Sequence, residues 1–355
     1  MQVSTDVPLA PLTTLGLGGP ARCLLEARSE EQLVDAVAAA DAACEPVLLL
    51  GGGSNLVLPD AGVPGTVVLI RTGGITTTDA GDGTVLLTVA SGEPWEPLVA
   101  HTVGAGLAGM ECLGGIPGLT GATPVQNVGA YGQDVGQTIT SVRAYDRADG
   151  AVRILGAEQC EFGYRHSRFK AEPARWVVLA VTFRLRRCEG SEDSEPVRYA
   201  ELARRLGIAV GGRAALADVF DAVLDLRRAK GMVIEPGDPD TASAGSFFTN
   251  PVLTAAQLEP LRQRIGAVPG YAEPDGRTKV PAAWLIERAG FGKGFGAELG
   301  SGRARVSSKH TLALTNRGGA TTAELLTLAR TIRDGVCERL GVELVNEPVI
   351  VGSTL

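Results

Sequence analysis

Residues 114–132 read GGIPGLTGATPVQNVGAYG, and this stretch decides the fold more than any other part of the chain. Its glycines and its two prolines favour neither a long helix nor a regular strand. A backbone of this kind is disfavoured unless its polar groups find partners, and a large ligand with polar and apolar parts would supply them. The alternative is a long structural loop without a ligand.

A second glycine-rich stretch, LGGGSNL at 50–56, lies between two short apolar runs, 46–50 and 67–70. The pattern predicts strand, loop, strand, with consecutive glycines that bring several N–H groups close to an anion such as a diphosphate. A plain turn between strands is the other interpretation. A Rossmann fingerprint is less favoured, because the one match to its spacing, Gly104, Gly106 and Gly109, follows a segment that is itself predicted to be helical.

Other elements follow from capping residues and from the period of the apolar positions. The acidic segment 189–195 is the most linker-like part of the chain. Helices are expected at about 30–43, 95–103, 199–206, 214–229, 254–265, 282–289 and 321–340, and strands at 84–90, 138–145, 152–155, 176–185 and 312–314, before an extended end at 342–351.

Composition excludes several classes of protein. The 355 residues are enough for two or three domains, and a formal charge of -7 repels a nucleic-acid backbone. Aromatic residues, at 5%, are too few for a carbohydrate-binding surface. Six cysteines without a Cys-x-x-Cys pair indicate buried thiols in a reducing compartment. With no secretory signal and no apolar run of membrane length, we expect a cytoplasmic protein that binds neither membrane nor nucleic acid.

Three further segments carry side chains suited to chemistry. Arg165 lies in a block of aromatic and cationic residues at 160–170, Ser246 lies in GSFFTNP at 245–251, and Glu347 lies in NEP at 346–348. A serine beside two phenylalanines can place its hydroxyl in a dry pocket and donate a proton. A Ser nucleophile is less favoured, because the chain has no Gly-x-Ser-x-Gly elbow there. The alternative for the block around Arg165 is a basic surface stretch. The alternative for Ser246 is a serine that caps or fills a turn, and that for Glu347 is an exposed glutamate on an edge strand.

In this order and spacing, the five segments closely resemble the MurB family, the UDP-N-acetylenolpyruvoylglucosamine reductases of bacterial cell-wall synthesis. Each motif is modest alone, but together they are specific, and the resemblance covers essentially the whole chain. The fold that it implies is α+β: a two-lobed FAD-binding unit of the PCMH or vanillyl-alcohol-oxidase type plus a separate α+β substrate-binding domain. The first lobe is expected at 1–80, completed by 329–355, a mainly antiparallel second lobe at 81–195, and the substrate domain at 196–328.

The activity implied by the resemblance is NADPH-dependent reduction of UDP-N-acetylglucosamine enolpyruvate to UDP-N-acetylmuramate. Non-covalently bound FAD passes a hydride to C3, and C2 is then protonated. By the same resemblance Arg165 faces the substrate carboxylate, and Ser246 is the acid that protonates C2. Glu347 helps to stabilise the intermediate, either as a protonated acid or by orienting Arg165. A guanidinium suits the first role because its fork holds both carboxylate oxygens while it stays charged.

The remaining expected contacts also come from the resemblance. The resemblance further implies a monomeric protein without a metal. Tyr199 matches a family type in which a tyrosine-bearing loop folds over the substrate nucleotide, and the segment 231–242 is an insertion relative to familiar members. The expected substrate contacts are Tyr164, Tyr199, Lys230, Asn250 and Lys279. The expected FAD contacts are Gly51, Gly52, Gly53, Ser54, Asn55, Gly115, Ile116, Pro117, Gly118, Gly121, Ala122, Pro124, Gln126, Asn127, Gly129, Ala130 and Tyr131.

Two other functions compete with this one. Another FAD oxidoreductase of the same superfamily would act on a hydroxy acid or an alcohol, often with its flavin tethered to a His or Cys, and 51–56 contains neither. A catalytically silent flavin or nucleotide-sugar sensor would keep the glycines and lose the proton donor. The presence of Arg165, Ser246 and Glu347 together favours the reductase.

Overall fold

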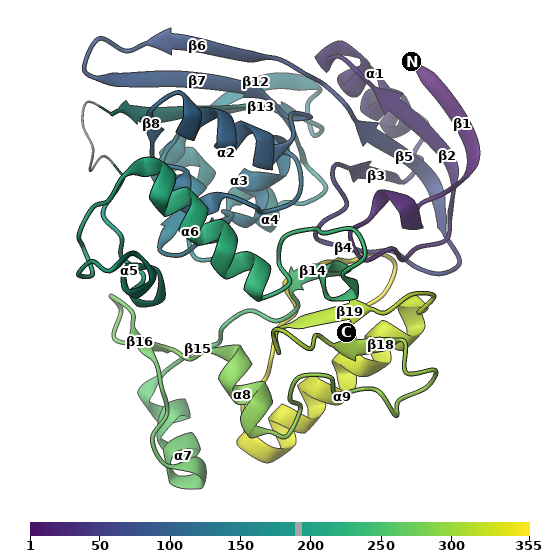
Figure 1. Cartoon of the computed structure of the whole chain (residues 1–355). Coiled ribbons are helices and arrows are strands. Elements are labelled where there is room, and N and C mark those ends of the chain that lie inside the picture. Colours follow the sequence, from purple (N-terminus) through teal and green to yellow (C-terminus); the bar gives the residue numbers. More distant parts are fainter. Residues whose placement is uncertain (189–193) are drawn as a thin grey trace. The chain divides into compact units, whose positions relative to one another are not determined.

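The structure is a computed structural model of residues 1–355 and describes all of them except 189–193 (Figure 1). The chain forms two compact units. The first consists of Met1–Val7, Ala21–Gly52 and Pro64–Ala229, and the second of Pro8–Pro20, Gly53–Val63 and Lys230–Leu355. Most of the predicted acidic linker lies outside the described residues. The expected boundaries near 80, 195 and 328 stay a prediction.

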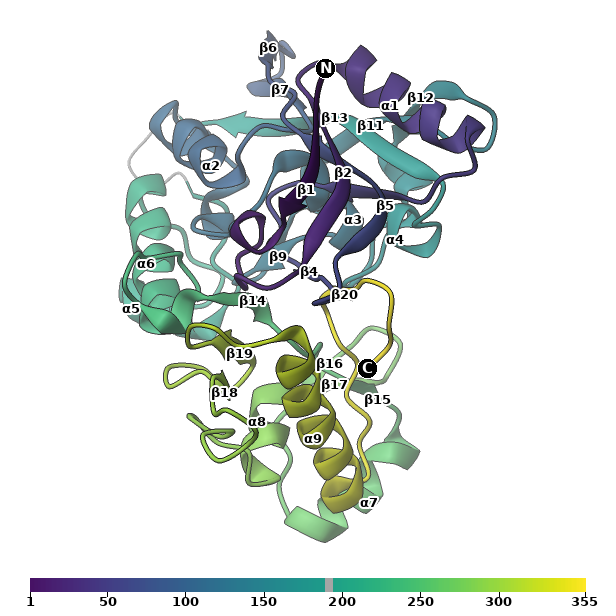
Figure 2. The same ribbon diagram turned by 90° about the vertical axis from the view of Figure 1, so that its right-hand side faces the viewer.

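A four-stranded sheet carries the N-terminal part of the first unit, in the order β1 (Gln2–Pro8), β2 (Pro20–Ala27), β5 (Val63–Ile70) and β3 (Val47–Leu50). Figure 2 shows β1, β2 and β5 side by side. Helix α1 (Glu30–Ala42) begins at Ser29, whose Oγ accepts a hydrogen bond from the Gln32 amide at 3.3 Å. The predicted helix, β3 and β5 are confirmed. Strand β1 was not predicted, because none of its residues is fully buried and its apolar pattern is weak.

The second sheet of this unit has six antiparallel strands. Helix α2 (Trp95–Gly104) covers it (Figure 1), and Trp95 and Val99 belong to the same buried apolar cluster as Val85 and Leu87 of the sheet. Four of the strands, and α2 itself, were predicted; the exposed edge strand β6 was not. The strand order is β12 (Ala151–Gly156), β11 (Ile139–Asp146), β13 (Trp176–Arg187), β7 (Thr84–Ala90) and β6 (Ile75–Asp79), and β8 (Leu107–Ala108) also pairs with β13.

The glycine-rich tract at 114–132 forms only short elements, as its sequence predicts. The longest is the four-residue helix α3 (Thr123–Gln126), and β9 (Gly129–Ala130) pairs with β10 (Gln133–Asp134). The one-turn helix α4 (Arg168–Ala171) follows later in the chain. Two predicted helices, α5 (Ala200–Leu206) and α6 (Leu216–Ala229), complete the unit and bury apolar residues against each other.

The second unit has a core of its own, in which helices α7 (Ala255–Ile265), α8 (Ala282–Arg288) and α9 (Thr322–Leu340) pack beside small sheets. All three helices were predicted. The expected capping box of α9 is present, with the Thr321 hydroxyl accepting from the Glu324 amide. The sheets are β14 (Ser243–Ser246), β19 (Ala313–Asn316) and β18 (Ala304–Val306); β15 (Val252–Leu253), β17 (Thr278–Lys279) and β16 (Tyr271–Ala272); and the parallel pair β20 (Val349–Ile350) and β4 (Leu56–Val57).

Two predictions were wrong, one about the C-terminal segment and one about the burial of the cysteines. The expected extended end at 342–351 contains only the two-residue strand β20, so Glu347 precedes the last strand instead of lying on it. Proline at 348 explains this, because it has no N–H to donate to a ladder. The thiols of Cys112 and Cys160 are buried as expected, but those of Cys44 and Cys337 are exposed.

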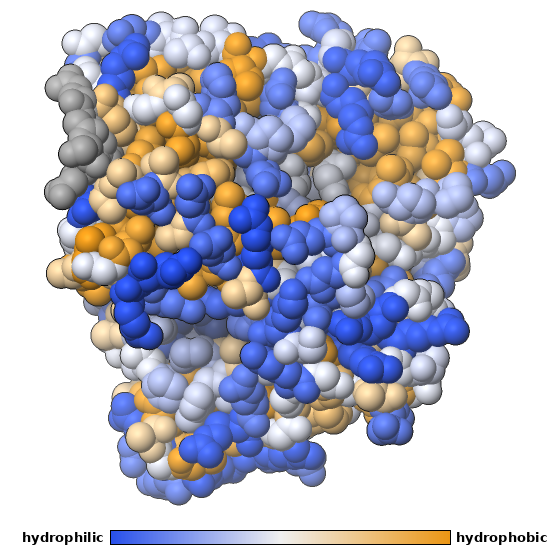
Figure 3. Space-filling model, viewed as in Figure 1, coloured by the Kyte–Doolittle hydropathy of each residue, from blue (hydrophilic) through white to orange (hydrophobic). Residues whose placement is uncertain are grey.

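Polar and apolar side chains are interspersed on the face shown in Figure 3. Among the helices that the structure describes, none combines the length and the apolar character needed to cross a membrane.

Asp146, at the end of β11, yields a prediction about acid stability. Its buried carboxylate accepts two hydrogen bonds from the Arg175 guanidinium, at 2.9 and 2.8 Å, which lower the pKa of Asp146 to about 2. An ordinary Asp titrates near 3.9 in an unfolded chain, so this group stabilises the fold above about pH 4 and loses that effect as the pH falls toward 2.

Asp146→Asn should therefore lower the urea midpoint at pH 7, and its difference from the parent should shrink between pH 4 and pH 2. Asp149→Asn, in the exposed turn of the same hairpin, is the matched control. Urea unfolding followed by circular dichroism at several pH values measures both, and a difference that stays constant down to pH 2 would contradict the assignment.

Candidate active site

The start of the 50–56 stretch meets the 114–132 tract within the first unit, at Gly52 and Gly118. A Cβ atom added to Gly52 would lie 2.7 Å from the Cα of Gly118, which is closer than real Cβ contacts allow. Gly118 has a φ of +124°, a conformation that side chains rarely adopt. Its carbonyl accepts a hydrogen bond from the Trp95 amide at 3.1 Å, which fixes the tract at the start of α2. Close approach of two backbones therefore explains why glycine is required at both positions.

Several amides of these stretches are available to a ligand. Gly115 is buried and has a φ of +69°, and within the described part of the chain neither its amide nor that of Ile116 donates a backbone hydrogen bond. The same holds for the amides of Gly52, Gly53 and Ser54 in the 50–56 loop. A buried N–H without an acceptor is costly, so the amides of the buried residues Gly53 and Gly115 would each suit an anionic or carbonyl oxygen of a ligand. Flavin adenine dinucleotide, with its diphosphate and its pyrimidinedione ring, is such a ligand.

Arg165 lies in a tight turn that rests on the same tract. Reciprocal backbone hydrogen bonds between Gly163 and His166, at 3.0 and 3.2 Å, close the turn around Tyr164 and Arg165. Arg165 has a φ of +52°, which costs a non-glycine residue roughly 1–2 kcal/mol. Its Nη2 donates to the Gly129 carbonyl at 3.1 Å. Strain of this kind at an arginine is characteristic of functional sites.

The side chain of Asn127 holds this turn at Gly163 by a hydrogen bond. Its Nδ2 donates to the Gly163 carbonyl at 2.9 Å, and its Oδ1 accepts from the Gly136 amide at 2.9 Å. Asn127 itself adopts a left-handed conformation, with a φ of 43°, at the end of α3. The structure thus brings Arg165 together with two residues predicted to contact FAD, Asn127 and Gly129.

Tyr131 and Tyr199 also come together in the first unit. Their rings meet edge to face, with centroids 5.4 Å apart. Tyr131 has a φ of +49°, and burial raises its pKa to about 12, so its hydroxyl stays protonated at neutral pH. A residue expected to contact FAD and one expected to cover the substrate are therefore neighbours.

Arg227 is a residue of this region that the sequence analysis missed. It is 8% exposed on α6, and its charge acts on Tyr131. Burial lowers the pKa of Arg227 to about 10, which leaves it a cation at neutral pH. Spacing could have revealed it, because Val219, Val223 and Arg227 follow one another at four-residue intervals on the buried face of the helix.

The second unit brings Ser246 and Glu347 to one place. Ser246 ends β14, opposite Ala313, after Gly245 with a φ of +71°. The amide of Glu347 donates to the carbonyl of Phe247 at 2.9 Å, so Glu347 is tied to the residue that follows Ser246. Phe247 and its neighbour Phe248 are almost fully buried and anchor this junction in the core.

Asn55 holds the other side of Glu347. Its Nδ2 donates to the Glu347 carbonyl at 3.4 Å, and its own carbonyl accepts from the Val349 amide at 2.9 Å. The end of the 50–56 loop therefore supports the Asn-Glu-Pro segment directly. This explains why two motifs almost 300 residues apart in sequence belong to one site.

The predicted substrate residues of the second unit have structural partners. Asn250 Oδ1 accepts from the Ala282 amide at 2.8 Å, at the start of α8. The ammonium of Lys279 lies 2.7 Å from a carboxylate oxygen of Glu273. Lys230 follows α6 directly and is half-buried. Their contacts with a substrate stay a prediction.

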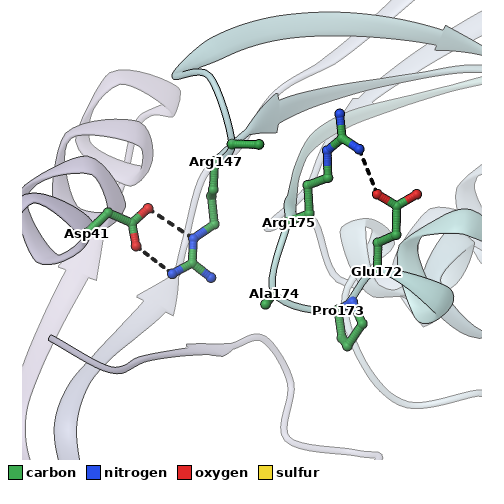
Figure 4. A pocket seen from close by; sticks show the side chains of 7 residues that line it. Asp41, Arg147, Glu172, Pro173, Ala174 and Arg175 are labelled. Carbon is green, nitrogen blue, oxygen red and sulfur yellow. Dashed lines mark hydrogen bonds and ion pairs between the residues drawn. The ribbon is translucent and has the colours of Figure 1, made fainter. Parts of the chain in front are cut away.

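A separate pocket of the first unit, with a volume of about 460 Å³, is lined by no predicted site residue (Figure 4). Arg147 is paired with Asp41, and Arg175 with Glu172, so its cations are already neutralised. We therefore do not assign it to a diphosphate. Its lining residues are Asp41, Arg147, Ala148, Glu172, Pro173, Ala174 and Arg175.

Two family descriptions match the chain. Residues 21–156 match the FAD binding domain, and residues 238–351 match the C-terminal domain of UDP-N-acetylenolpyruvoylglucosamine reductase. The first range includes both glycine-rich stretches. The second includes Ser246 and Glu347. FAD is therefore the cofactor of this chain, in agreement with the amides described above.

Whole proteins match as well. A UDP-N-acetylenolpyruvoylglucosamine reductase of Thermobifida fusca is 53% identical over 357 residues, which covers 99% of this chain and 98% of the relative. The enzyme of the same description from Streptomyces coelicolor is 55% identical, covering 99% of this chain and 90% of the relative. The crystal structure of the Thermus caldophilus reductase has a TM-score of 0.64 and 26% identity, and the match covers 98% of each chain.

Gly52→Ala tests the contact between the glycine-rich stretches. Because the new Cβ would collide with the backbone at Gly118, the two stretches should separate. An overpacking cost of about 1–3 kcal/mol, if it falls on binding, corresponds to roughly fivefold to 150-fold weaker FAD binding. Gly104→Ala is the control, since its Cβ would meet no atom within 4 Å. Titration of the flavin-free proteins with FAD measures both affinities. Equal affinity in the parent and Gly52→Ala proteins would disprove the role of this contact.

Proposed function

The chain belongs to the UDP-N-acetylenolpyruvoylglucosamine reductase family, and on this premise we propose that it reduces UDP-N-acetylglucosamine enolpyruvate to UDP-N-acetylmuramate with NADPH as the hydride donor. The observation that carries the mechanism is the backbone hydrogen bond from Glu347 to Phe247, which places Glu347 beside the residue after Ser246. Bound FAD supplies two-electron hydride chemistry, and the loops at 50–56 and 114–132 would hold it.

In this reaction Arg165 stabilises the negative charge that develops on the substrate. Addition of a hydride to C3 of the enol ether puts negative charge on C2 and into a carboxylate that is already anionic. A guanidinium fixed in place before the reaction stabilises that charge without having to reorient. The left-handed turn and the bond to Gly129 give Arg165 this fixed position. Removal of such a group typically slows the chemical step by two to three orders of magnitude.

Ser246 then protonates C2. Its neighbours Phe247 and Phe248 are buried, which keeps part of the surroundings of the hydroxyl dry. An ordinary hydroxyl is a weak acid, so a group beside it must help, either by lowering its pKa or by relaying the proton. The backbone of Glu347 is bonded to Phe247, the residue after Ser246, and we propose that the Glu347 carboxyl group gives this help.

In the proposed reaction, NADPH and the sugar nucleotide bind to the same site one after the other. NADPH leaves before the enolpyruvyl compound enters, so the kinetics are of the ping-pong type and no separate nicotinamide domain is required. The product serves peptidoglycan precursor synthesis, and we place the reaction in the cytoplasm, where nucleotide-linked sugars are made.

Ser246→Ala separates the two half-reactions. Only reoxidation of the flavin by the enolpyruvyl substrate needs the C2 proton, so that rate should fall by at least about a hundredfold. The rate of flavin reduction by NADPH should stay within about threefold of the parent. Anaerobic stopped-flow absorbance measures both rates. Comparable losses in the two half-reactions would rule out Ser246 as the proton donor.

The manner of FAD attachment distinguishes this proposal from the other oxidoreductases of the superfamily. The 50–56 loop offers no His or Cys for a covalent bond. Denaturation with acid or guanidinium followed by filtration should therefore leave all of the yellow colour in the filtrate and a colourless polypeptide. Flavin retained by the denatured polypeptide would favour the competing class of enzyme.

A further inference from the structure

Lys170 ends the block that contains Arg165, and the proposed function gives it no role. Its ammonium donates hydrogen bonds to the Arg165 carbonyl oxygen at 2.9 Å and to Gln126 Oε1 at 3.1 Å. Lys170 is half-buried, and Gln126 is 7% exposed. The side chain thus joins the backbone of a strained turn to the glycine-rich tract.

Local structure sets Lys170 at this point. Ser167 caps the one-turn helix α4, because its Oγ accepts from the Lys170 amide at 3.2 Å. The same hydroxyl donates to the Val125 carbonyl at 2.7 Å, so α4 is bonded to α3. The residue before Lys170, Phe169, is 3% exposed and packs in the core of the unit. A buried serine and a buried phenylalanine therefore fix the helix from which Lys170 extends.

The turn around Arg165 is held at two points of the tract. Its backbone is tied to Gln126 through Lys170, and its side chain is tied to Gly129. Hydrogen bonds from an ammonium are stronger than those between neutral groups, so the Lys170 contact can hold the Arg165 carbonyl where the left-handed backbone conformation places it. Without that contact, a positive φ at a non-glycine residue is unfavourable, and the turn would relax toward the common region.

We propose that Lys170 is a positioning residue, which keeps the Arg165 turn in its left-handed conformation and so sets the guanidinium in place for the anionic carboxylate of the substrate. This inference rests on the role proposed above for Arg165. Lys170 acts through Arg165, so its effect should fall on the step that needs the guanidinium.

The variant that tests this is Lys170→Met, which keeps the length of the side chain and removes its donors. Because small displacements of a catalytic group are costly, reoxidation of the flavin by the enolpyruvyl sugar nucleotide should slow by roughly tenfold to a hundredfold. Flavin reduction by NADPH should change less than about threefold. Lys170→Arg keeps a cation with donors and should recover most of the lost rate. Lys293→Met, at an exposed lysine of the second unit, is the control and should leave both rates unchanged.

A double-mutant cycle with Arg165→Ala distinguishes positioning from a merely structural role. If Lys170 acts through Arg165, adding Lys170→Met to Arg165→Ala should slow reoxidation by less than about twofold further. The full loss in both backgrounds, or equal losses in both half-reactions, would overturn the proposal. If Lys170→Met does not retain FAD, the same two comparisons are made with Lys170→Gln. An Arg165→Ala protein with a normal reoxidation rate would instead reject the proposed role of Arg165 itself.

Discussion

The hydrogen bond from Arg165 to the Gly129 carbonyl is the contact on which the rest of the site depends. The bond joins the side chain of a residue whose backbone is left-handed, with a φ of +52°, to the glycine-rich tract. A strained arginine persists only where its surroundings hold it, because the left-handed conformation costs roughly 1–2 kcal/mol. The Gly163–His166 turn, Asn127 and Lys170 together do so. The tract proposed to hold FAD and the arginine proposed to face the substrate carboxylate are thereby joined by hydrogen bonds.

In the second unit, hydrogen bonds likewise hold the segments that carry Ser246, the proposed proton donor, and Glu347. Asn55 and Phe247 hold the backbone of Glu347 from two sides, and Phe247 and Phe248 anchor the strand end at Ser246 in the core. Backbone hydrogen bonds thus set the position of this segment. Both units therefore place their reactive groups on short, irregular segments that are bonded to well-packed neighbours, as an active site that must be preorganised requires.

The sequence predicted the regular elements where apolar spacing was strong. Helices α1, α2, α6 and α9 and strands β7 and β13 lie where the patterns place them. It also identified the two glycine-rich stretches, because the required residue type is visible there. It missed β1 and β6, whose residues are largely exposed, and it extended the C-terminal strand through Pro348. These failures share a cause, since short edge strands are set by neighbours that local pattern does not reveal.

Contacts between distant segments were the least accessible to sequence reasoning. The edge-to-face pair of Tyr131 and Tyr199 and the bond from Asn55 to Glu347 follow from the folded chain alone. Arg227 was missed although its helical spacing was available. In the proposed reaction, NADPH and the enolpyruvyl sugar nucleotide act in turn on one bound flavin. Anaerobic titration of the FAD-loaded protein tests it: one equivalent of NADPH should bleach the flavin absorbance, and one equivalent of the sugar nucleotide should restore it. A reduced flavin that only oxygen can reoxidise would contradict the account.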